Sequence, residues 1–328
     1  MFRFLLGLAF TAASLAFLWW LVDWNVTIDV LKHAHPAYIA LAVSALVLSI
    51  AAKTLRWRLL LPSSAPVSTP RLYRILHISF LINNVLPARL GDVARVTMTT
   101  RQPGLRLGHV VSSLLTERVT DTVTLVAGFV LVSPLLPLPD AYKPWLHIAW
   151  VVVAVFSGLF LVVVVFPRRA ARVGHFLMFR RRLPLGERMR QEVASFREGF
   201  TQLFSRRRLV PIWGFSWLAW AGAFSINYLL MRALDIDAPI AVAVLITCTT
   251  NLAMLAPSTP GYIGVFHSAA ALSLIPFNVA DSTAVSFAIL AHLVNVVPVS
   301  LIGAVFLLSG RESLSFKRSR EPLIEQGS

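Results

Sequence analysis

Uncharged apolar runs recur along the chain, and they leave few folds open to it. The first, Phe4–Val22, carries no charge over nineteen residues, which is about the length of helix needed to cross roughly 30 Å of hydrocarbon. Further uncharged runs are Ala37–Ala52, Trp145–Phe166, Leu209–Met231 and Ser282–Leu308. The stretch Val111–Ser133 becomes apolar after the charged residues Glu117, Arg118 and Asp121. Only 14% of the residues are charged, whereas about a quarter would be charged in a soluble domain. We therefore predict an all-α integral membrane protein.

Two more apolar stretches are interrupted by residues that break helices. In both, a Gly follows a Pro by four residues: Pro87 and Gly91 in the first, Pro257 and Gly261 in the second. Broken helices in opposite halves of a membrane protein often form a substrate site between them. We therefore expect the two breaks to approach each other near the middle of the membrane. The alternative is two Pro-kinked helices with no site between them.

The broken segments, Arg71–Met98 and Ala238–Ile275, complete a predicted fold of about eight transmembrane helices with re-entrant parts and a possible inverted repeat. Residues 1–310 are predicted to form one transmembrane domain, which includes a basic cytoplasmic loop at 167–208. Residues 311–328 are expected to form a short basic cytoplasmic tail.

The basic residues predict the orientation of the chain. Of its 30 Lys and Arg residues, 27 fall on one side of the membrane in this threading, and Lys32, Lys143 and Arg232 fall on the other. Because cytoplasmic loops carry the excess of Lys and Arg, both termini are predicted to be cytoplasmic, in a protein of the plasma (inner) membrane. The charges flank apolar runs instead of covering one folded face, so the net charge of +15 does not indicate nucleic-acid binding.

Three motifs in order resemble the lysylphosphatidylglycerol synthase transmembrane family, a flippase-like domain. They are an Asn-rich segment before Leu-Pro-x-Arg-x-Gly-Asp at 83–92, Glu-Arg-x-x-Asp at 117–121, and Pro-x-x-Pro-Gly-x-x-Gly-x-Phe at 257–266. The family pattern continues with Glu where this chain has His267. The resemblance implies that the protein moves or handles lipids across the bilayer, and other relatives are linked to hopanoid or polyprenyl-lipid pathways. Some relatives carry a fused synthase domain, which we do not expect here.

A lipid translocase needs a few polar groups at membrane depth. Arg89 and Arg118 are candidates for an anionic headgroup, because a guanidinium binds phosphate through two parallel hydrogen bonds. The carboxylates expected to neutralise these arginines are Asp92, Glu117 and Asp121. The alternative is a structural cluster of ion pairs that binds no lipid.

The helix-breaking residues are expected to free backbone groups, which protein or water must then satisfy. They are Pro87, Gly91, Pro257, Pro260, Gly261 and Gly264. Polar side chains suited to this task, or to ligand contact, are Asn83, Asn84, Asn251, Ser258 and Thr259. Their alternative role is hydrogen bonding between helices.

Two histidines in apolar surroundings, His267 and His292, either relay protons or simply pack. No residue pattern indicates a metal ion or a cofactor, and we expect neither. The predicted function is a lipid translocase or lipid-binding transporter for an anionic or polyprenyl/hopanoid-type lipid, and not an enzyme. The alternatives are a membrane-embedded transferase acting on a lipid-linked substrate and a non-transporting partner of a lipid-modifying enzyme. Membrane lipids, such an enzyme and a second copy of the chain are the expected partners.

The orientation can be tested with single cysteines in a variant that lacks Cys248. A membrane-impermeant maleimide added from outside should label Asp140→Cys and should fail to label Arg180→Cys, because only position 180 lies in the predicted cytoplasmic loop. Permeabilised cells provide the control, in which both positions should react. Strong external labelling at position 180 would reverse the assignment.

Overall fold

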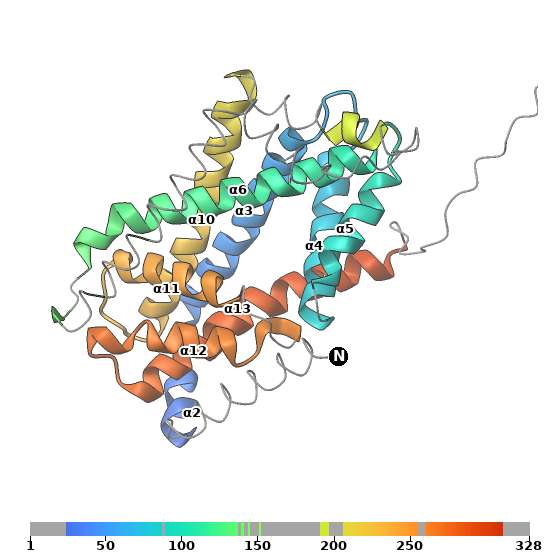
Figure 1. Cartoon of the computed structure of the whole chain (residues 1–328). Coiled ribbons are helices and arrows are strands. Elements are labelled where there is room, and N and C mark those ends of the chain that lie inside the picture. The colour runs from blue at the N-terminus through green and yellow to red at the C-terminus, as the bar shows by residue number, and fades with distance from the viewer. Residues whose placement is uncertain are drawn as a thin grey trace, which may run out of the picture.

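The computed structural model describes residues 24–86, 89–136, 139–140, 144, 151, 191–196, 206–254 and 260–310 (Figure 1). Every regular element within these ranges is a helix. The α-helices are α2 (Trp24–Lys32), α3 (Pro36–Leu60), α4 (Thr69–Val85), α5 (Leu90–Thr100), α6 (Leu107–Val132), α10 (Arg206–Ala233), α11 (Ile240–Ala253), α12 (Val265–Leu272) and α13 (Asp281–Leu308). Short 3-10 turns lie at Ser133–Leu135, Pro260–Tyr262 and Ile275–Phe277.

Four helices of this part are long and apolar enough to cross a membrane: Pro36–Leu60, Leu107–Leu135, Arg208–Ala233 and Asp281–Leu308. They agree with four of the predicted spans, and the prediction of an all-helical membrane fold is confirmed. The predicted spans Phe4–Val22 and Trp145–Phe166 lie outside the described residues, apart from Val151. The tail at 311–328 and most of the basic loop lie outside them too, so the total of eight spans stays a prediction.

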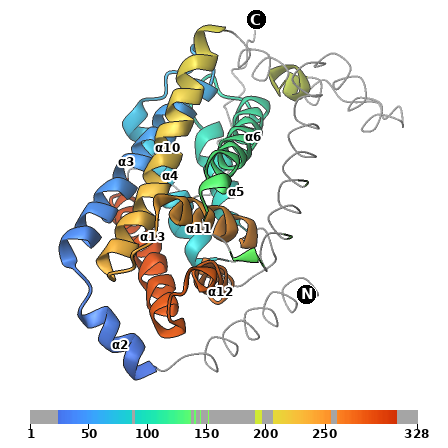
Figure 2. The same cartoon turned by 90° about the vertical axis from the view of Figure 1, so that its left-hand side faces the viewer.

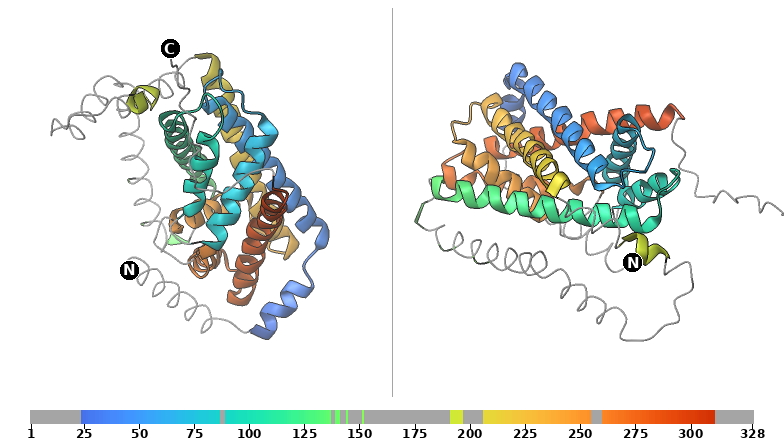
Figure 3. Two further views of the ribbon diagram at one scale, coloured as in Figure 1. Left: turned by 90° about the vertical axis from the view of Figure 1, so that its right-hand side faces the viewer. Right: turned by 90° about the horizontal axis from the view of Figure 1, so that it is seen from above.

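The long helices α3 and α10 form an antiparallel pair. At one end the His35 amide donates to the Ala233 carbonyl at 2.8 Å, and in the middle the Ser49 hydroxyl donates to the Ala219 carbonyl at 2.8 Å. At the other end the Arg208 guanidinium donates to the Leu59 carbonyl at 3.4 Å. Figure 2 shows the two helices side by side, with α2 beyond one end of the pair. The helix α6 crosses the α3–α10 pair obliquely (Figures 1 and 3).

The structure adds two features at the ends of α3 to what the sequence predicted. The predicted span Ala37–Ala52 lies within α3, but the helix continues past the basic residues Lys53 and Arg56 to Leu60. It continues because Arg56 is fully buried and paired with a carboxylate from another helix. The polar connection before α3 contains a helix of its own, α2, whose polar residues such as Asn25 and Asp29 lie on its exposed side.

The first broken segment is a helical hairpin of α4 and α5. The Ser79 hydroxyl of α4 donates to the Gly91 carbonyl of α5 at 2.9 Å, and the Gly91 amide donates to the Asn83 side-chain oxygen at 2.8 Å. The chain reverses between these helices, with Arg89 in a left-handed conformation (φ 54°) at the start of α5. Pro87 lies outside the described residues. The predicted break in Arg71–Met98 is confirmed.

Gly91 was predicted to break a helix, and this prediction is wrong. It lies inside the first turn of α5 and is buried against α4. A Cβ at this position would lie 2.0 Å from the Ser79 carbonyl oxygen and 2.6 Å from the Asn83 side-chain oxygen. Gly91 therefore allows two backbones to approach closely, as small residues do between membrane helices.

The second broken segment is a hairpin of α11 and α12. The Thr249 and Ser273 hydroxyls hydrogen-bond across it at 2.6 Å. In the turn before α12, Gly261 (φ 69°), Tyr262 (φ 56°) and Gly264 (φ 84°) all have positive φ. Gly261 and Gly264 thus interrupt the helix as predicted, and Pro260 begins the short 3-10 turn. Pro257, Ser258 and Thr259 lie outside the described residues.

The two hairpins meet at their tips. The Arg89 guanidinium of the first donates to the Met254 carbonyl at 3.1 Å and to the Tyr262 hydroxyl at 3.2 Å, both in the second. A Cβ on Gly261 would lie 3.3 Å from the Asn84 carbonyl oxygen, so the backbones are close as well. The predicted approach of the two breaks is confirmed, while their depth in the membrane and the inverted repeat stay predictions.

Gly91 offers a direct test of this packing. Gly91→Ala should lower the thermal stability of the protein in detergent, because overpacking a tight contact costs about 1–3 kcal/mol. Gly214→Ala is the matched control, since Gly214 is also helical but has no atom within 4 Å of its Cβ position. That control should leave the melting temperature unchanged or raise it, as Ala stabilises a helix relative to Gly by about 0.5–1 kcal/mol. Equal melting temperatures for the two variants would contradict the close contact.

Candidate functional site

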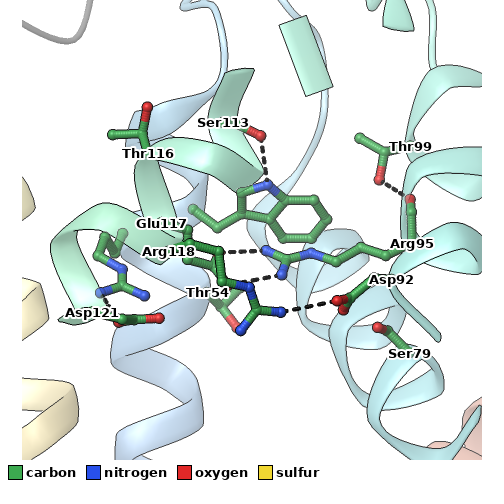
Figure 4. Close-up of polar contacts among 12 residues, drawn as sticks. Thr54, Ser79, Asp92, Arg95, Thr99, Ser113, Thr116, Glu117, Arg118 and Asp121 are labelled. Carbon is green, nitrogen blue, oxygen red and sulfur yellow. Dashed lines mark hydrogen bonds and ion pairs between the residues drawn. The ribbon is translucent and has the colours of Figure 1, made fainter. Parts of the chain in front are cut away.

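Polar side chains gather where α5 and α6 lie against α3, and a buried ion pair is at their centre (Figure 4). Arg95 of α5 donates two hydrogen bonds to the Glu117 carboxylate of α6, at 3.0 and 2.7 Å. The Arg95 guanidinium also lies over the Trp57 ring of α3, 3.7 Å from its centroid. Both charged residues are buried. This geometry, two parallel bonds and a stacked ring, is the one for which Arg is suited and Lys is not.

A second buried pair joins α3 to α6. Arg56, with none of its side chain exposed, lies 2.6 Å from the Asp121 carboxylate. It also donates to the Ser216 hydroxyl of α10 at 3.0 Å, and the Trp220 indole N–H of α10 donates to Asp121 at 3.0 Å. Two nitrogens of Arg56, Nε and Nη2, are buried and have no hydrogen-bond partner within the described part of the chain.

A third pair, Arg118 with Asp92, is more accessible. The guanidinium of α6 and the carboxylate of α5 lie 3.0 Å apart, with 51% and 29% of the side chains exposed. Asp92 also accepts a hydrogen bond from the Asn83 amide at 3.4 Å. Since only one terminal nitrogen of Arg118 binds Asp92, the rest of this guanidinium remains available to a ligand.

Lys53 makes the cluster positive. Its ammonium lies 5.3 Å from the centroid of the Trp220 ring, one helical turn before Arg56. It forms no ion pair with a carboxylate of the described residues. We call these seven side chains the charge cluster: Lys53, Arg56, Arg95 and Arg118 with Asp92, Glu117 and Asp121. Four cations face three anions, so the charge cluster has one positive charge in excess.

The pairing differs from the one expected from the sequence. Glu117 and Asp121 were expected to neutralise Arg89 and Arg118, but they bind Arg95 and Arg56. Only the pairing of Asp92 with Arg118 is as expected. The reason is helix geometry: Glu117 and Asp121 face inward on α6, toward α5 and α3. Arg56, Arg95 and Lys53 were missed as candidates, although charged residues within apolar helices were the available signal.

Arg89 does not take part in the charge cluster. It was expected to bind a headgroup or to pair with Asp92, but its guanidinium bonds to the tip of the second hairpin. Because Asp92 is bound by Arg118, the hypothesis of an Arg89–Asp92 pair is wrong. The described contacts of Arg89 are those of a residue that connects the two hairpins.

The three predicted asparagines bond to protein groups. Asn83 binds the Gly91 amide and Asp92, as described above. Asn84 donates to the Ser300 hydroxyl of α13 at 3.0 Å, and Asn251 donates to the Thr247 carbonyl of its own helix at 2.8 Å. Asn83 thus satisfies backbone at a break, and Asn84 forms the bond between helices that was the alternative. Ser258 and Thr259 lie outside the described residues.

The family model of the lysylphosphatidylglycerol synthase TM region matches residues 4–303 of the chain. This match covers nearly all of the sequence, including the helices that carry the charge cluster and both hairpins. The chain belongs to this family. No curated protein matches it significantly. Members of the family are membrane domains associated with lipid handling, and this chain is accordingly an integral membrane protein of that class.

The two kinds of ion pair in this family member should respond differently to mutation. Arg95→Ala leaves Glu117 buried without its partner, which costs about 3–5 kcal/mol, and should strongly lower the melting temperature or the yield. Arg118→Ala is the matched control, because its accessible pair contributes only about 0–1 kcal/mol.

The measurement is thermal unfolding in detergent for both variants and for the double variant Arg95→Met/Glu117→Leu. The double variant should recover much of the stability, since it removes both buried charges. A similar small loss for Arg95→Ala and Arg118→Ala would show that Arg95 and Glu117 are not a buried pair.

Proposed function

We propose that the protein is a translocase for lipids with an anionic headgroup, and that the charge cluster binds this headgroup. Family membership supports lipid handling in general, and the chemistry of the cluster supports the anionic class. The proposal describes a transporter and assigns no catalytic residue.

The excess positive charge of the cluster carries the proposal. Charges in a membrane protein are costly unless they are paired, and within the described part of the chain the three carboxylates of the cluster leave Lys53 without an ion-pair partner. A phosphate monoanion would supply the missing negative charge and several acceptor oxygens. The partly exposed Lys53 and the accessible Arg118 are the groups to which it would bind, whereas the buried Arg56 and Arg95 are occupied by carboxylates.

The surroundings of the cluster suit the rest of a lipid molecule. Next to Arg118 and Asp92, α5 and α6 expose large apolar side chains, among them Leu90 (42%), Val93 (51%), Leu115 (50%) and Val119 (39%). A headgroup at the charge cluster could therefore keep its acyl chains in contact with an apolar surface. Only the polar headgroup would then lie within the protein, and the headgroup is the part that a translocase must keep out of the hydrocarbon.

The distribution of basic residues supports access from the cytoplasmic leaflet. The described arginines that gather at one end of the bundle are Arg58, Arg71, Arg74, Arg101, Arg106 and Arg208, while Lys32 and Arg232 lie at the other end. Under the positive-inside rule the arginine-rich end is cytoplasmic. Lys53 lies within two turns of that end of α3, so we place the charge cluster in the cytoplasmic half of an inner-membrane protein.

The test is transport by the pure protein in liposomes. A fluorescent phosphatidylglycerol analogue should be moved across the bilayer faster than a phosphatidylcholine analogue. Lys53→Gln and Arg118→Ala should each slow transport of the anionic analogue about ten- to a hundred-fold, since a hydrogen bond to a charged group contributes about 1.5–3 kcal/mol. Arg118→Lys should fall between, because it keeps the charge and loses the planar fork.

Arg232→Ala is the matched control. Arg232 is accessible and paired with Asp237 at 2.8 Å, but it lies at the opposite end of the bundle, so transport should remain at the wild-type rate. Equal rates for all variants would exclude the charge cluster as the headgroup site. Chemical conversion of the lipid would favour the transferase alternative, and an absence of transport by the pure protein would favour a partner role.

A further inference from the structure

His267 of α12 and His292 of α13 lie against each other beside the tip of the second hairpin. Their ring centroids are 4.6 Å apart and the rings are nearly perpendicular, at 80°. Phe266 packs on the His292 ring at 5.3 Å. Both histidines are partly accessible, and neither belongs to the charge cluster. We call them the histidine pair.

The hydrogen bonds of the histidine pair determine its tautomers. The Gly264 amide donates to Nδ1 of His267 at 3.2 Å, so this nitrogen carries no proton. Nε2 of His292 lies 2.7 Å from the Gly261 carbonyl oxygen, which can only accept, so this nitrogen carries the proton. The His267 ring is neutral in this arrangement, and both rings bind the turn that contains the left-handed residues 261, 262 and 264.

The two histidines would respond differently to an added proton. On His292 the proton would go to Nδ1, and the bond from Nε2 to Gly261 would be kept and strengthened by the charge. On His267 the proton would go to Nδ1 and would face the Gly264 N–H, so that bond would be lost. Two charged rings at this distance would also repel each other. The pair can therefore accept one proton, and His292 is the better acceptor.

The Nδ1 atom of His292 is free to take up a proton. This atom has no hydrogen-bond partner within the described residues and is not among their buried unpaired polar atoms. Among the described side chains, no titratable or charged group on the elements packed against α12 and α13 forms an ion pair or a hydrogen bond with either ring. These groups are Asp29 and Lys32 on α2, Tyr38, Lys53, Arg56 and Arg58 on α3, Arg71, Tyr73, Arg74 and His77 on α4, Arg89 at the start of α5, Arg208, Tyr228 and Arg232 on α10, Cys248 on α11, Tyr262 in the turn and Asp281 on α13.

We propose that the histidine pair is the site of a coupling proton in transport, with His292 as the group that binds the proton and His267 as a positioning residue. The proton strengthens the bond to Gly261 and so stabilises the turn whose next residue, Tyr262, binds Arg89 of the first hairpin. Loss of the proton weakens that support and favours separation of the two tips. The inference rests on the proposed function, because the separation of the two tips would be a step in lipid transport.

Two substitutions distinguish the roles. Gln at position 292 can still donate to the Gly261 carbonyl and Gln at position 267 can still accept from the Gly264 amide, but neither takes up a proton in this pH range. His292→Gln should therefore abolish the pH dependence of liposome transport between roughly pH 4 and 8. His267→Gln should fold equally well and keep a pH dependence.

A second measurement is independent of transport. Spectra of 15N-histidine in the full-length protein, titrated over the same range, should show one ring of the pair becoming doubly protonated. The signal that disappears in His292→Gln identifies it, and His267→Gln should retain it. His267→Glu should move the midpoint of that signal to higher pH, because a carboxylate beside His292 stabilises the charged ring.

The two readouts separate the possible failures. If His292 titrates but no lipid is transported at any pH, the proposed function is wrong and the proton-binding site stands. If lipid is transported and His292→Gln keeps the wild-type pH profile, the coupling role is wrong. Titration of His267 instead of His292, uptake of two protons by the pair, or no titration of either ring would each overturn the proton site.

Discussion

The buried bond between Arg95 and Glu117 is the interaction on which the arrangement of helices around the charge cluster depends. Inside a membrane protein water is scarce, so a charge on one helix must find its partner on another. Arg95 and Glu117 meet this requirement between α5 and α6, and Arg56 with Asp121 meets it between α3 and α6. Trp57 and Trp220 contribute a ring and an indole donor to the two pairs. The position of α6 across the α3–α10 pair is thus specified by polar groups as well as by apolar packing.

The breaks in the helices depend on a second constraint, the satisfaction of free backbone groups. At the first break, the Asn83 side chain accepts from the Gly91 amide. At the second, His292 donates to the Gly261 carbonyl and His267 accepts from the Gly264 amide. Side chains that looked like ligand-binding groups in the sequence are therefore partly committed to the backbone. These bonds to the backbone give each hairpin tip a defined conformation, and so they determine how the two tips meet.

Sequence reasoning predicted the four long apolar helices and both breaks because length, polarity and helix-breaking residues are local properties. It also identified Asp92, Glu117, Arg118 and Asp121 as unusual at their depth. It could not predict which charges pair, because the partners of Glu117 and Asp121 come from segments far along the chain, at Arg95 and Arg56. Gly91 was misread for a related reason: its role depends on the nearby Ser79 carbonyl, and the local pattern of Pro and Gly does not contain that contact.

The first break connects the charge cluster to the second hairpin within four residues. Arg89 binds the tip of that hairpin, while Asp92, one turn later, binds Arg118 of the cluster. In the proposed function, an anionic headgroup on the free nitrogens of Arg118 would share this guanidinium with the Asp92 carboxylate and weaken the bond between them. Asp92 would then depend more on its bond from Asn83, and the start of α5 would lose one of its contacts to α6. Binding of a headgroup would in this way alter the position of the start of α5, which carries Arg89. A ligand at the charge cluster and the contact between the hairpin tips would then affect each other's stability, as thermodynamic linkage requires.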